Sequence, residues 1–210
     1  GHETVKPLNG REKAKEARRQ LIIKAAEELV RETSSTSFSM HDLAKRAGLS
    51  TYTTYNLIGS KATVFYILLN QCIDRIDTAR ILSEAKGDPL DCVLQSGNAS
   101  VNLFVSDPDF YRPLMRFVFG VLDPVHRPAF MDRSYRYWRA AIAPLIEAGH
   151  IGTEFMPVDL ARDLLVFFTG ALEFWVHGEL DSEEFRAQIR HGLAMRLMTL
   201  DIKDSRERLL

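Results

Sequence analysis

The sequence predicts an all-α protein, and two observations lead to this fold class. Apolar residues recur at steps of three and four along nearly the whole chain, whereas alternating strand patterns and Asn-Gly hairpin turns are missing. Glycine, or proline beside an N-capping residue, divides the chain into segments of helical length. We expect nine helices.

The first expected helix is basic and amphipathic. Ala14, Ala17, Leu21, Ala25 and Leu29 form its apolar stripe, and charged residues cover the opposite face. It ends in a run of serine and threonine over residues 33–37, whose short polar side chains compete for backbone hydrogen bonds.

Two short helices follow. Ser39 and Asp42 have the spacing of a capping box at the first, and Gly48 can take the left-handed conformation that ends it. Ser50 can cap the second, over about residues 51–57, and Gly59 ends that helix.

The remaining helices are longer. Asp-Pro pairs, Gly149, Pro157 and the Asp181-Ser182 pair mark their limits, because aspartate or serine caps a helix and proline is tolerated in its first turn. The expected segments are 61–85, 89–105, one after Pro108, 129–148, 157–176 and 182–200. Residues 201–210 are charged, and we expect them to fray.

Composition is that of a globular protein, with 46% hydrophobic and 26% charged residues. Residues 1–61 carry 11 Lys and Arg against 7 Asp and Glu, and the remainder carries 16 against 21, which together give the net charge of −1. A basic N-terminal part indicates that a polyanion would bind there. We expect two domains, 11–60 and 61–202.

The two short helices and their turn meet the requirements of a helix-turn-helix. The first helix has an apolar inner face, Gly48 permits positive φ in the turn, and Leu49 is an apolar residue that can pack between the two helices. The second helix carries hydroxyls, phenols and an amide, which suit base edges and phosphates in a major groove.

The segment from about Lys13 to Phe65 resembles the DNA-binding domain of the tetracycline-repressor (TetR) family of bacterial transcriptional regulators. The matching stretches are Ser39-Met40-His41-Asp42-Leu43-Ala44, Gly48-Leu49-Ser50, Thr53-Thr54-Tyr55 and Gly59-Ser60-Lys61. The chain departs from the family pattern at Leu57-Ile58, where a His-Phe or Tyr-Phe pair is usual, and at Thr54, where an apolar residue is common.

The resemblance implies a DNA interface. Ser39, Tyr55 and Lys61 would contact phosphates of double-stranded operator DNA. The surface nearest the base edges would be Thr51, Tyr52, Thr53 and Asn56, preceded by the cap Ser50. The alternative from the residues alone is an ordinary helical pair in which Tyr55 is a half-buried core residue.

The second domain is rich in aromatic residues. The resemblance implies a pocket for a small-molecule effector there, and the aromatic load suggests that this effector is hydrophobic or aromatic. Our candidate lining residues are Phe104, Tyr111, Phe117, Trp138, Phe168 and Trp175, with His177 as a polar group. Each ring could equally fill the helical core.

The last two expected helices carry broad apolar stripes. Those residues are Leu164, Leu165, Phe168, Leu172 and Trp175, then Phe185, Ile189, Leu193, Leu197 and Met198. The resemblance implies that both helices pair with their copies in a homodimer. A two-fold axis would let two recognition helices reach successive major grooves of a palindrome.

The sequence contains no sign of an enzyme. The histidines are scattered, Cys72 and Cys92 form no motif, and nucleophile elbows and phosphate-binding loops are missing, so we expect neither a catalytic site, a metal nor a cofactor. No apolar run approaches the ~20 residues that span a bilayer, and no signal-peptide core follows the N-terminus. We expect a cytoplasmic protein with buried, reduced thiols.

The function that the resemblance implies is that of a dimeric repressor released from its operator by the effector. Effector entry would wedge the C-terminal helices apart and move the helix that begins at Lys61. Two other readings remain open. One is a DNA-binding protein controlled by a protein partner, and the other is a helical small-molecule-binding protein whose N-terminal motif is vestigial.

Overall fold

The computed structural model describes residues 6–76, 78–151, 157–200 and 205–210, and these residues form helices and loops without a strand. The all-α prediction is confirmed. The chain divides into two compact units, Gly1–Asn70 and Gln71–Leu210, which we call the N-terminal and C-terminal units. The division lies ten residues beyond the expected boundary at residues 60 and 61, because most of the helix that follows packs with the N-terminal unit.

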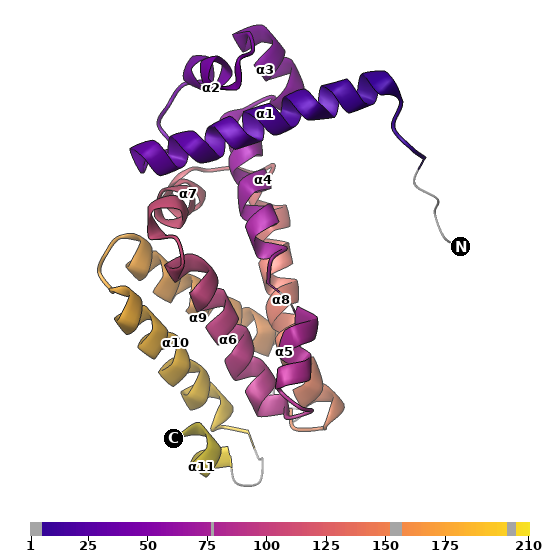
Figure 1. The fold of residues 1–210 in the computed structure, drawn as a ribbon. Helices are drawn as coiled ribbons and strands as arrows, with labels where there is room; N and C mark the ends of the chain where they lie inside the picture. Colours follow the sequence, from indigo (N-terminus) through magenta and orange to yellow (C-terminus); the bar gives the residue numbers. More distant parts are fainter. Residues whose placement is uncertain (1–5, 77, 152–156, 201–204) are drawn as a thin grey trace. The chain divides into compact units, whose positions relative to one another are not determined.

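The N-terminal unit is built from α1 (Gly10–Thr33), α2 (Met40–Ala47), α3 (Thr51–Ile58) and the greater part of α4 (Lys61–Ile73). α2 and α3 lie against α1 on one side of it (Figure 1). The core of the unit contains Ile22, Ala26, Leu43 and Phe65, which are almost wholly buried.

Local side-chain chemistry sets the helix ends in this unit. The Ser39 hydroxyl accepts the Asp42 N–H at 3.0 Å and the Asp42 carboxylate accepts the Ser39 N–H at 3.0 Å, which completes the expected capping box. Hydrogen bonds from the Ser39 backbone and hydroxyl lower the pKa of Asp42. Gly48 ends α2 at φ 73°, a conformation that glycine adopts without strain.

The C-terminal unit contains the end of α4 and seven further helices. These are α5 (Thr78–Glu84), α6 (Pro89–Val105), α7 (Pro108–Gly120), α8 (Arg127–Glu147), α9 (Pro157–Val176), α10 (Ser182–Leu197) and α11 (Ser205–Leu209). α6 packs against α8 and α10, and α9 packs against α7, α8 and α10. Cys72 and Cys92 are both buried thiols outside any disulfide, as expected.

Two expectations about helix number are wrong. The long helix over 61–85 is divided, because α4 ends at Ile73 in tight turns (Arg75 N–H to Cys72 O at 3.1 Å) and α5 begins at Thr78. Apolar spacing continues through the break, which hid it from the sequence pattern. The tail also includes α11, so the described residues contain eleven helices rather than nine.

Two glycines bring α10 close to its neighbours. A Cβ on Gly97 of α6 would lie 2.4 Å from Leu193 Cδ1, and one on Gly192 of α10 would lie 2.0 Å from Phe167 Cζ. The Arg196 guanidinium covers the same Phe167 ring at 4.1 Å from its centroid. The small residues therefore set the spacing of α6, α9 and α10.

Candidate functional site

The outer face of α3 is exposed. Tyr52 has 77% and Tyr55 49% of its surface open to solvent, and Asn56 is exposed as well. The inner face is closed, because Thr54 and Ile58 are buried at 0% and 5%. α3 therefore presents two phenols and an amide outward, on a short helix anchored by its opposite face.

The N-terminus of α3 is tied to α2. The Ser50 hydroxyl accepts the Thr53 N–H at 3.1 Å and donates to Thr53 Oγ1 at 2.9 Å. His41 Nδ1 lies 3.3 Å from Thr51 Oγ1, a hydrogen bond between the two helices of the motif. Ser50, Thr51 and Thr53 thus already take part in hydrogen bonds that fix the start of α3.

Lys61 holds the start of α4 against the connection between α1 and α2. Its Nζ donates to Thr36 O at 3.0 Å and to Phe38 O at 2.7 Å, and lies 5.6 Å from the centroid of the Phe38 ring. Burial lowers the pKa of Lys61, and the Asp42 carboxylate opposes this effect. Two of the three ammonium protons are thereby engaged, next to the Ser39 cap.

Arg46 is committed to α1. Its guanidinium donates to both carboxylate oxygens of Glu32, at 2.7 and 2.6 Å, and to Glu28 at 3.5 Å. The hydrogen bond from Arg46 lowers the pKa of Glu32. This cation therefore joins α1 to α2 instead of adding to a free positive surface.

The two departures from the family pattern are accommodated inside the motif. Thr54 is buried in place of an apolar residue, and its hydroxyl donates to the Ser50 carbonyl at 3.0 Å, so the polar group is satisfied. Leu57 is half-buried and Ile58 is buried. Tyr52, Tyr55 and Asn56 remain the exposed residues of α3.

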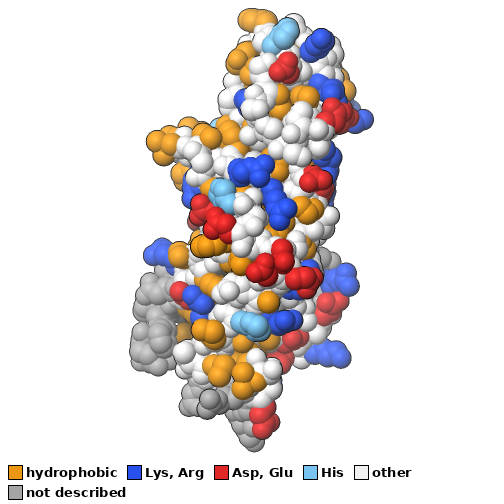
Figure 2. All heavy atoms as spheres, turned by 90° about the vertical axis from the view of Figure 1, so that its left-hand side faces the viewer, with side chains coloured by type: hydrophobic (Ala, Val, Ile, Leu, Met, Phe, Trp, Pro, Cys, Tyr) orange, Lys and Arg blue, Asp and Glu red, His pale blue; other side chains and the backbone are white. Residues whose placement is uncertain are grey.

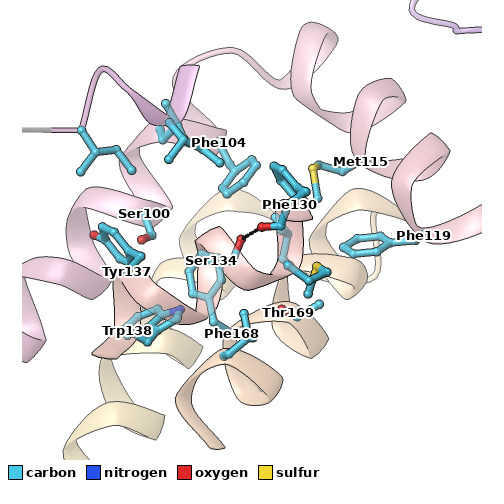
Figure 3. A pocket seen from close by; sticks show the side chains of 16 residues that line it. Ser100, Phe104, Met115, Phe119, Phe130, Ser134, Tyr137, Trp138, Phe168 and Thr169 are labelled. Carbon is cyan, nitrogen blue, oxygen red and sulfur yellow. Dashed lines mark hydrogen bonds between the residues drawn. The ribbon is translucent and has the colours of Figure 1, made fainter. Parts of the chain in front are cut away.

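The C-terminal unit contains an apolar cavity of about 60 Å³. Figure 3 shows side chains of α6, α7, α8 and α9 around it. Its wall is made by Ile73, Ile76, Ser100, Leu103, Phe104, Met115, Phe119, Phe130, Met131, Ser134, Tyr137, Trp138, Leu165, Phe168, Thr169 and Leu172. Lysine, arginine, aspartate and glutamate are all missing from this set.

Apart from the indole N–H of Trp138, the few polar groups in the wall are hydroxyls. Ser100 Oγ donates to Ser96 O at 3.0 Å, Ser134 Oγ to Phe130 O at 3.1 Å, and Tyr137 Oη to Ser96 O at 2.6 Å. Burial raises the pKa of Tyr137 to about 12, so this phenol stays neutral. Since their protons are in use, these oxygens retain only acceptor capacity.

Three of the expected lining residues lie in the cavity wall: Phe104, Trp138 and Phe168. Their rings contact one another, with centroids 6.2 Å apart for Phe104 and Phe168 and 5.5 Å apart for Trp138 and Phe168. These three rings come from α6, α8 and α9, and the cavity lies where the three helices meet.

The other four expected lining residues do not line the cavity. Tyr111 and Trp175 form a second layer behind Phe104, at 5.3 and 6.4 Å between centroids, because the aromatic core is several rings thick. Phe117 is half-buried outside the wall. His177 is exposed after the end of α9, where Nδ1 bonds to Glu173 O at 2.9 Å.

Several residues of the cavity wall were not predicted from the sequence. Met115 and Met131 are flexible apolar residues, and Ser134 and Thr169 are small polar residues on otherwise apolar faces. A hydroxyl recurring on the inward side of α6, α8 and α9 was the available signal. Serine and threonine also occur inside helices where their hydroxyls bond to the preceding turn, so the packing of the helices is needed to recognise those that line a cavity.

The apolar stripes expected at a dimer interface lie mostly inside the protomer. Leu164, Leu172 and Trp175 of α9 and Phe185, Ile189, Leu193 and Leu197 of α10 are at most 3% exposed, because α9 and α10 cover α6, α7 and α8. These residues are core. The expectation that these residues form the surface of the interface is wrong, although both helices do carry the expected apolar stripes.

Other side chains of α9 and α10 are exposed and apolar. Val166 and Phe174 on α9 are 64% and 52% exposed, and Met195 on α10 is 66% exposed. Figure 2 shows the side on which α10 lies, where hydrophobic side chains reach the surface among charged ones. α9 and α10 pack against each other, and we call these three exposed apolar residues (Val166, Phe174 and Met195) the α9–α10 face.

The helix-turn-helix unit and the helical unit with its cavity together have the fold of TetR-family transcriptional regulators. A TetR regulator from Rhodococcus sp. RHA1 matches over 88% of this chain and 97% of its own, at 23% identity and a TM-score of 0.61. NalD of Pseudomonas aeruginosa, the secondary repressor of the MexAB-OprM multidrug efflux pump, matches over 91% and 99%, at 19% identity and a TM-score of 0.64.

A third similar structure is the TetR regulator tylp from Streptomyces fradiae. It matches over 96% of this chain and 87% of its own, at 20% identity and a TM-score of 0.58. No family model matches the sequence, and no curated protein matches it. The resemblance seen in residues 13–65 is thus confirmed as a fold over nearly the whole chain.

Within the described residues, no cluster of three or more metal-ligating side chains occurs. The same residues contain no helix with the length and apolar character needed to cross a bilayer.

Proposed function

We propose that the protein is a dimeric, effector-controlled DNA-binding repressor. The observation that carries the proposal is the outer face of α3, where Tyr52, Tyr55 and Asn56 are exposed on a helix fixed from behind by Thr54 and Ile58. A rigid helix that presents such groups suits direct readout in the major groove.

Phosphate contacts would surround this readout surface. Ser39 lies at the N-terminus of α2, where the helix dipole favours anions, and Tyr55 and Lys61 extend the same interface. Two of the Lys61 protons are engaged by Thr36 and Phe38, which leaves one for a phosphate oxygen. Tyr52, Thr53 and Asn56 would then select the sequence.

The effector would be neutral, largely apolar and small. The cavity is lined without a charged group, so an anion or cation would be desolvated there without a partner. Its volume of about 60 Å³ is well below that of common ligand pockets, roughly 300–1,000 Å³. Met115 and Met131 can rearrange to enlarge it, and the acceptor oxygens favour an effector that donates a hydrogen bond, such as a phenol or alcohol.

α4 supplies a connection between effector and DNA. Ile73, its last residue, lies in the cavity wall, and Lys61, its first, anchors the segment before the Ser39 cap. An effector that displaces Ile73 would move the whole helix, which is about 18 Å long between these residues. The DNA-incompetent conformation would thereby be favoured.

The dimer would form through the α9–α10 face, which is the exposed apolar part of the two helices that the family uses for pairing. A two-fold axis would present two copies of α3 to a palindromic site. A DNA-binding protein controlled only by a protein partner would use the same α3 face and would show no ligand in the cavity.

The test combines DNA and ligand binding. A duplex is selected by the protein from a random library, and its release is followed as neutral phenols, alcohols and matched carboxylic acids are added. We expect release and a raised Tm with neutral compounds only. Release by carboxylates alone would contradict the cavity assignment, and failure to select any duplex would contradict DNA binding.

A further inference from the structure

The first half of α1 is exposed. Every side chain from Gly10 to Arg18 is open to solvent, Arg19 is half-buried, and Ile22 is the first buried residue of the helix. Figure 1 shows this half extending past α2 and α3 of the same unit. We call residues 10–20 the arm.

The arm is ordered by its own chemistry. Asn9 Oδ1 accepts the Glu12 N–H at 2.9 Å and Glu12 Oε2 accepts the Asn9 N–H at 3.0 Å, a complete capping box at the start of the helix. An isolated helix of about this length is only marginally stable in water. The helical conformation of the arm is therefore stabilised by the cap and by its continuity with the buried half of α1. The arm is therefore a rigid extension that adds nothing to the core of the unit.

One face of the arm is basic. Arg11, Lys15 and Arg18 follow one another at steps of four and three, and the series continues through Ile22, Ala26 and Leu29. Residues at this spacing lie on one face of a helix. The three cations, which we call the arm stripe, thus extend the face of α1 that is buried further along.

The arm stripe faces the side of the readout surface. The buried face of α1 is the one that α2 and α3 pack against, and the stripe continues that face toward the N-terminus. A duplex held by the outer face of α3 would have its flanking backbone on this side of α1.

The cations of the stripe are available to an outside anion. Within the described residues, no ion pair joins Arg11, Lys15 or Arg18 to a carboxylate. The nearby carboxylates are occupied: Glu12 accepts the Asn9 N–H, and Glu16 accepts from the Gln20 amide at 2.8 Å. Charge complementarity therefore favours a polyanion as the partner of this face.

We infer that the arm stripe binds the phosphate backbone of DNA flanking the half-site that α3 reads. The inference depends on the proposed function, since it concerns the same duplex. The arm is about 16 Å long, at 1.5 Å per residue, and could follow about five base pairs. Because phosphates carry no sequence information, the arm adds affinity and length of footprint without adding sequence preference.

The test uses two variants of equal charge in the full-length protein. The arm variant is Lys15→Gln/Arg18→Gln, and the control, Lys13→Gln/Lys24→Gln, removes two exposed cations from the opposite face of the same helix. Binding is measured by fluorescence anisotropy against salt, on a 40-bp duplex selected by the wild type and on shortened versions of it. Melting temperature is measured alongside, and all four side chains are exposed, so we expect it to change little.

For the arm variant we expect the negative slope of log K against log salt to become shallower by about 1.8, which corresponds to the loss of two phosphate contacts. In the control variant, the salt slope should change by less than half as much. Shortening the duplex until the roughly five base pairs that flank each half-site are lost should weaken the wild type more than the arm variant, which retains only Arg11 of the stripe.

Three results separate the possible failures. If the wild type binds no duplex, the proposed function fails. If the wild type binds and the arm variant matches the control in slope and in length dependence, the arm inference fails alone. If the arm variant loses binding to phosphatidylglycerol vesicles while its DNA binding equals the control, the partner is an anionic lipid surface and the inference is also overturned.

Discussion

The N-terminal and C-terminal units differ in how far apart in sequence their decisive contacts lie. In the N-terminal unit, most of the hydrogen bonds that fix the ends of α2 and α3 join residues at most five positions apart, such as Ser39 with Asp42. In the C-terminal unit, the cavity joins residues as distant as Ile73 and Leu172. Short-range chemistry can be read from a sequence, whereas a cavity depends on how helices pack.

The two units also use exposed apolar and aromatic groups differently. Tyr52 and Tyr55 lie on a helix that is polar around them, whereas Val166, Phe174 and Met195 are exposed on two helices that pack against each other. A phenol amid hydroxyls suits a hydrated polar partner, and a clustered apolar face suits a protein surface.

The largest expected effect follows from breaking the α9–α10 face with Val166→Glu/Phe174→Glu. Both side chains are exposed, so the protomer should fold but remain monomeric at micromolar concentration. Affinity for a palindromic duplex should fall by about 10²-fold or more, because the second half-site is then bound independently. Sedimentation and anisotropy measure the two effects.

The matched control is Leu122→Glu/Val125→Glu, which adds the same charge in the loop between α7 and α8, where these residues are 94% and 75% exposed. We expect this variant to remain dimeric and to bind as the wild type does. A dimeric Val166→Glu/Phe174→Glu protein would show that the copies pair elsewhere.

The close approach of α9 and α10 is tested by Gly192→Ala. The added methyl group would meet the Phe167 ring at 2.0 Å, and this ring lies between Gly192 and Arg196. We expect a loss of about 1–3 kcal/mol in the free energy of unfolding, the usual cost of overpacking. Denaturant titration measures it.

Gly120→Ala is the control, since a Cβ there meets nothing within 4 Å. It should leave stability within about 0.5 kcal/mol of the wild type. Equal stability of the two variants would contradict the tight packing of α10 on α9.

Capping and DNA contact at Ser39 can be separated with two substitutions. Ser39→Ala removes the cap and should cost about 1 kcal/mol of stability. Ser39→Asp retains a capping oxygen but places a carboxylate where a phosphate would bind, so stability should be kept while DNA affinity falls at least tenfold. Retained affinity in Ser39→Asp would remove Ser39 from the interface.

Much of the N-terminal unit could be predicted from the sequence. Capping pairs, Gly48 and the polar outer face of α3 are local features, and the structure contains them as expected. The double engagement of Lys61 by Thr36 and Phe38 could not be predicted, because it joins residues more than twenty positions apart.

In the C-terminal unit the sequence predicted helices and an aromatic core, but not which rings border empty space. Phe104 lines the cavity and Trp175 stacks behind it, although both lie on inward helix faces. The end of α4 at Ile73 was also hidden, because Cys72, Ile76 and Ala79 keep helical steps of four and three beyond it. Apolar periodicity predicts which side of a helix faces the core. It does not predict whether a side chain on that side borders a cavity or lies behind another ring.

The smallest of these effects concerns Lys61→Ala. The variant loses two charge-assisted hydrogen bonds to carbonyls and, on the proposed function, one phosphate contact. We expect weaker binding to every duplex, a salt slope flatter by about 0.9, and reduced stability of the N-terminal unit. Reduced stability with an unchanged salt slope would mean that Lys61 anchors α4 and does not touch DNA.

The central claim is that the outer face of α3 selects a DNA sequence. Selection from a random duplex library, with the wild type and Asn56→Ala in parallel, tests it most directly. We predict an inverted repeat for the wild type, and altered bases at matching positions in both half-sites for the variant, with an equal salt slope. The same consensus from both proteins, or no enrichment by the wild type, would contradict the account.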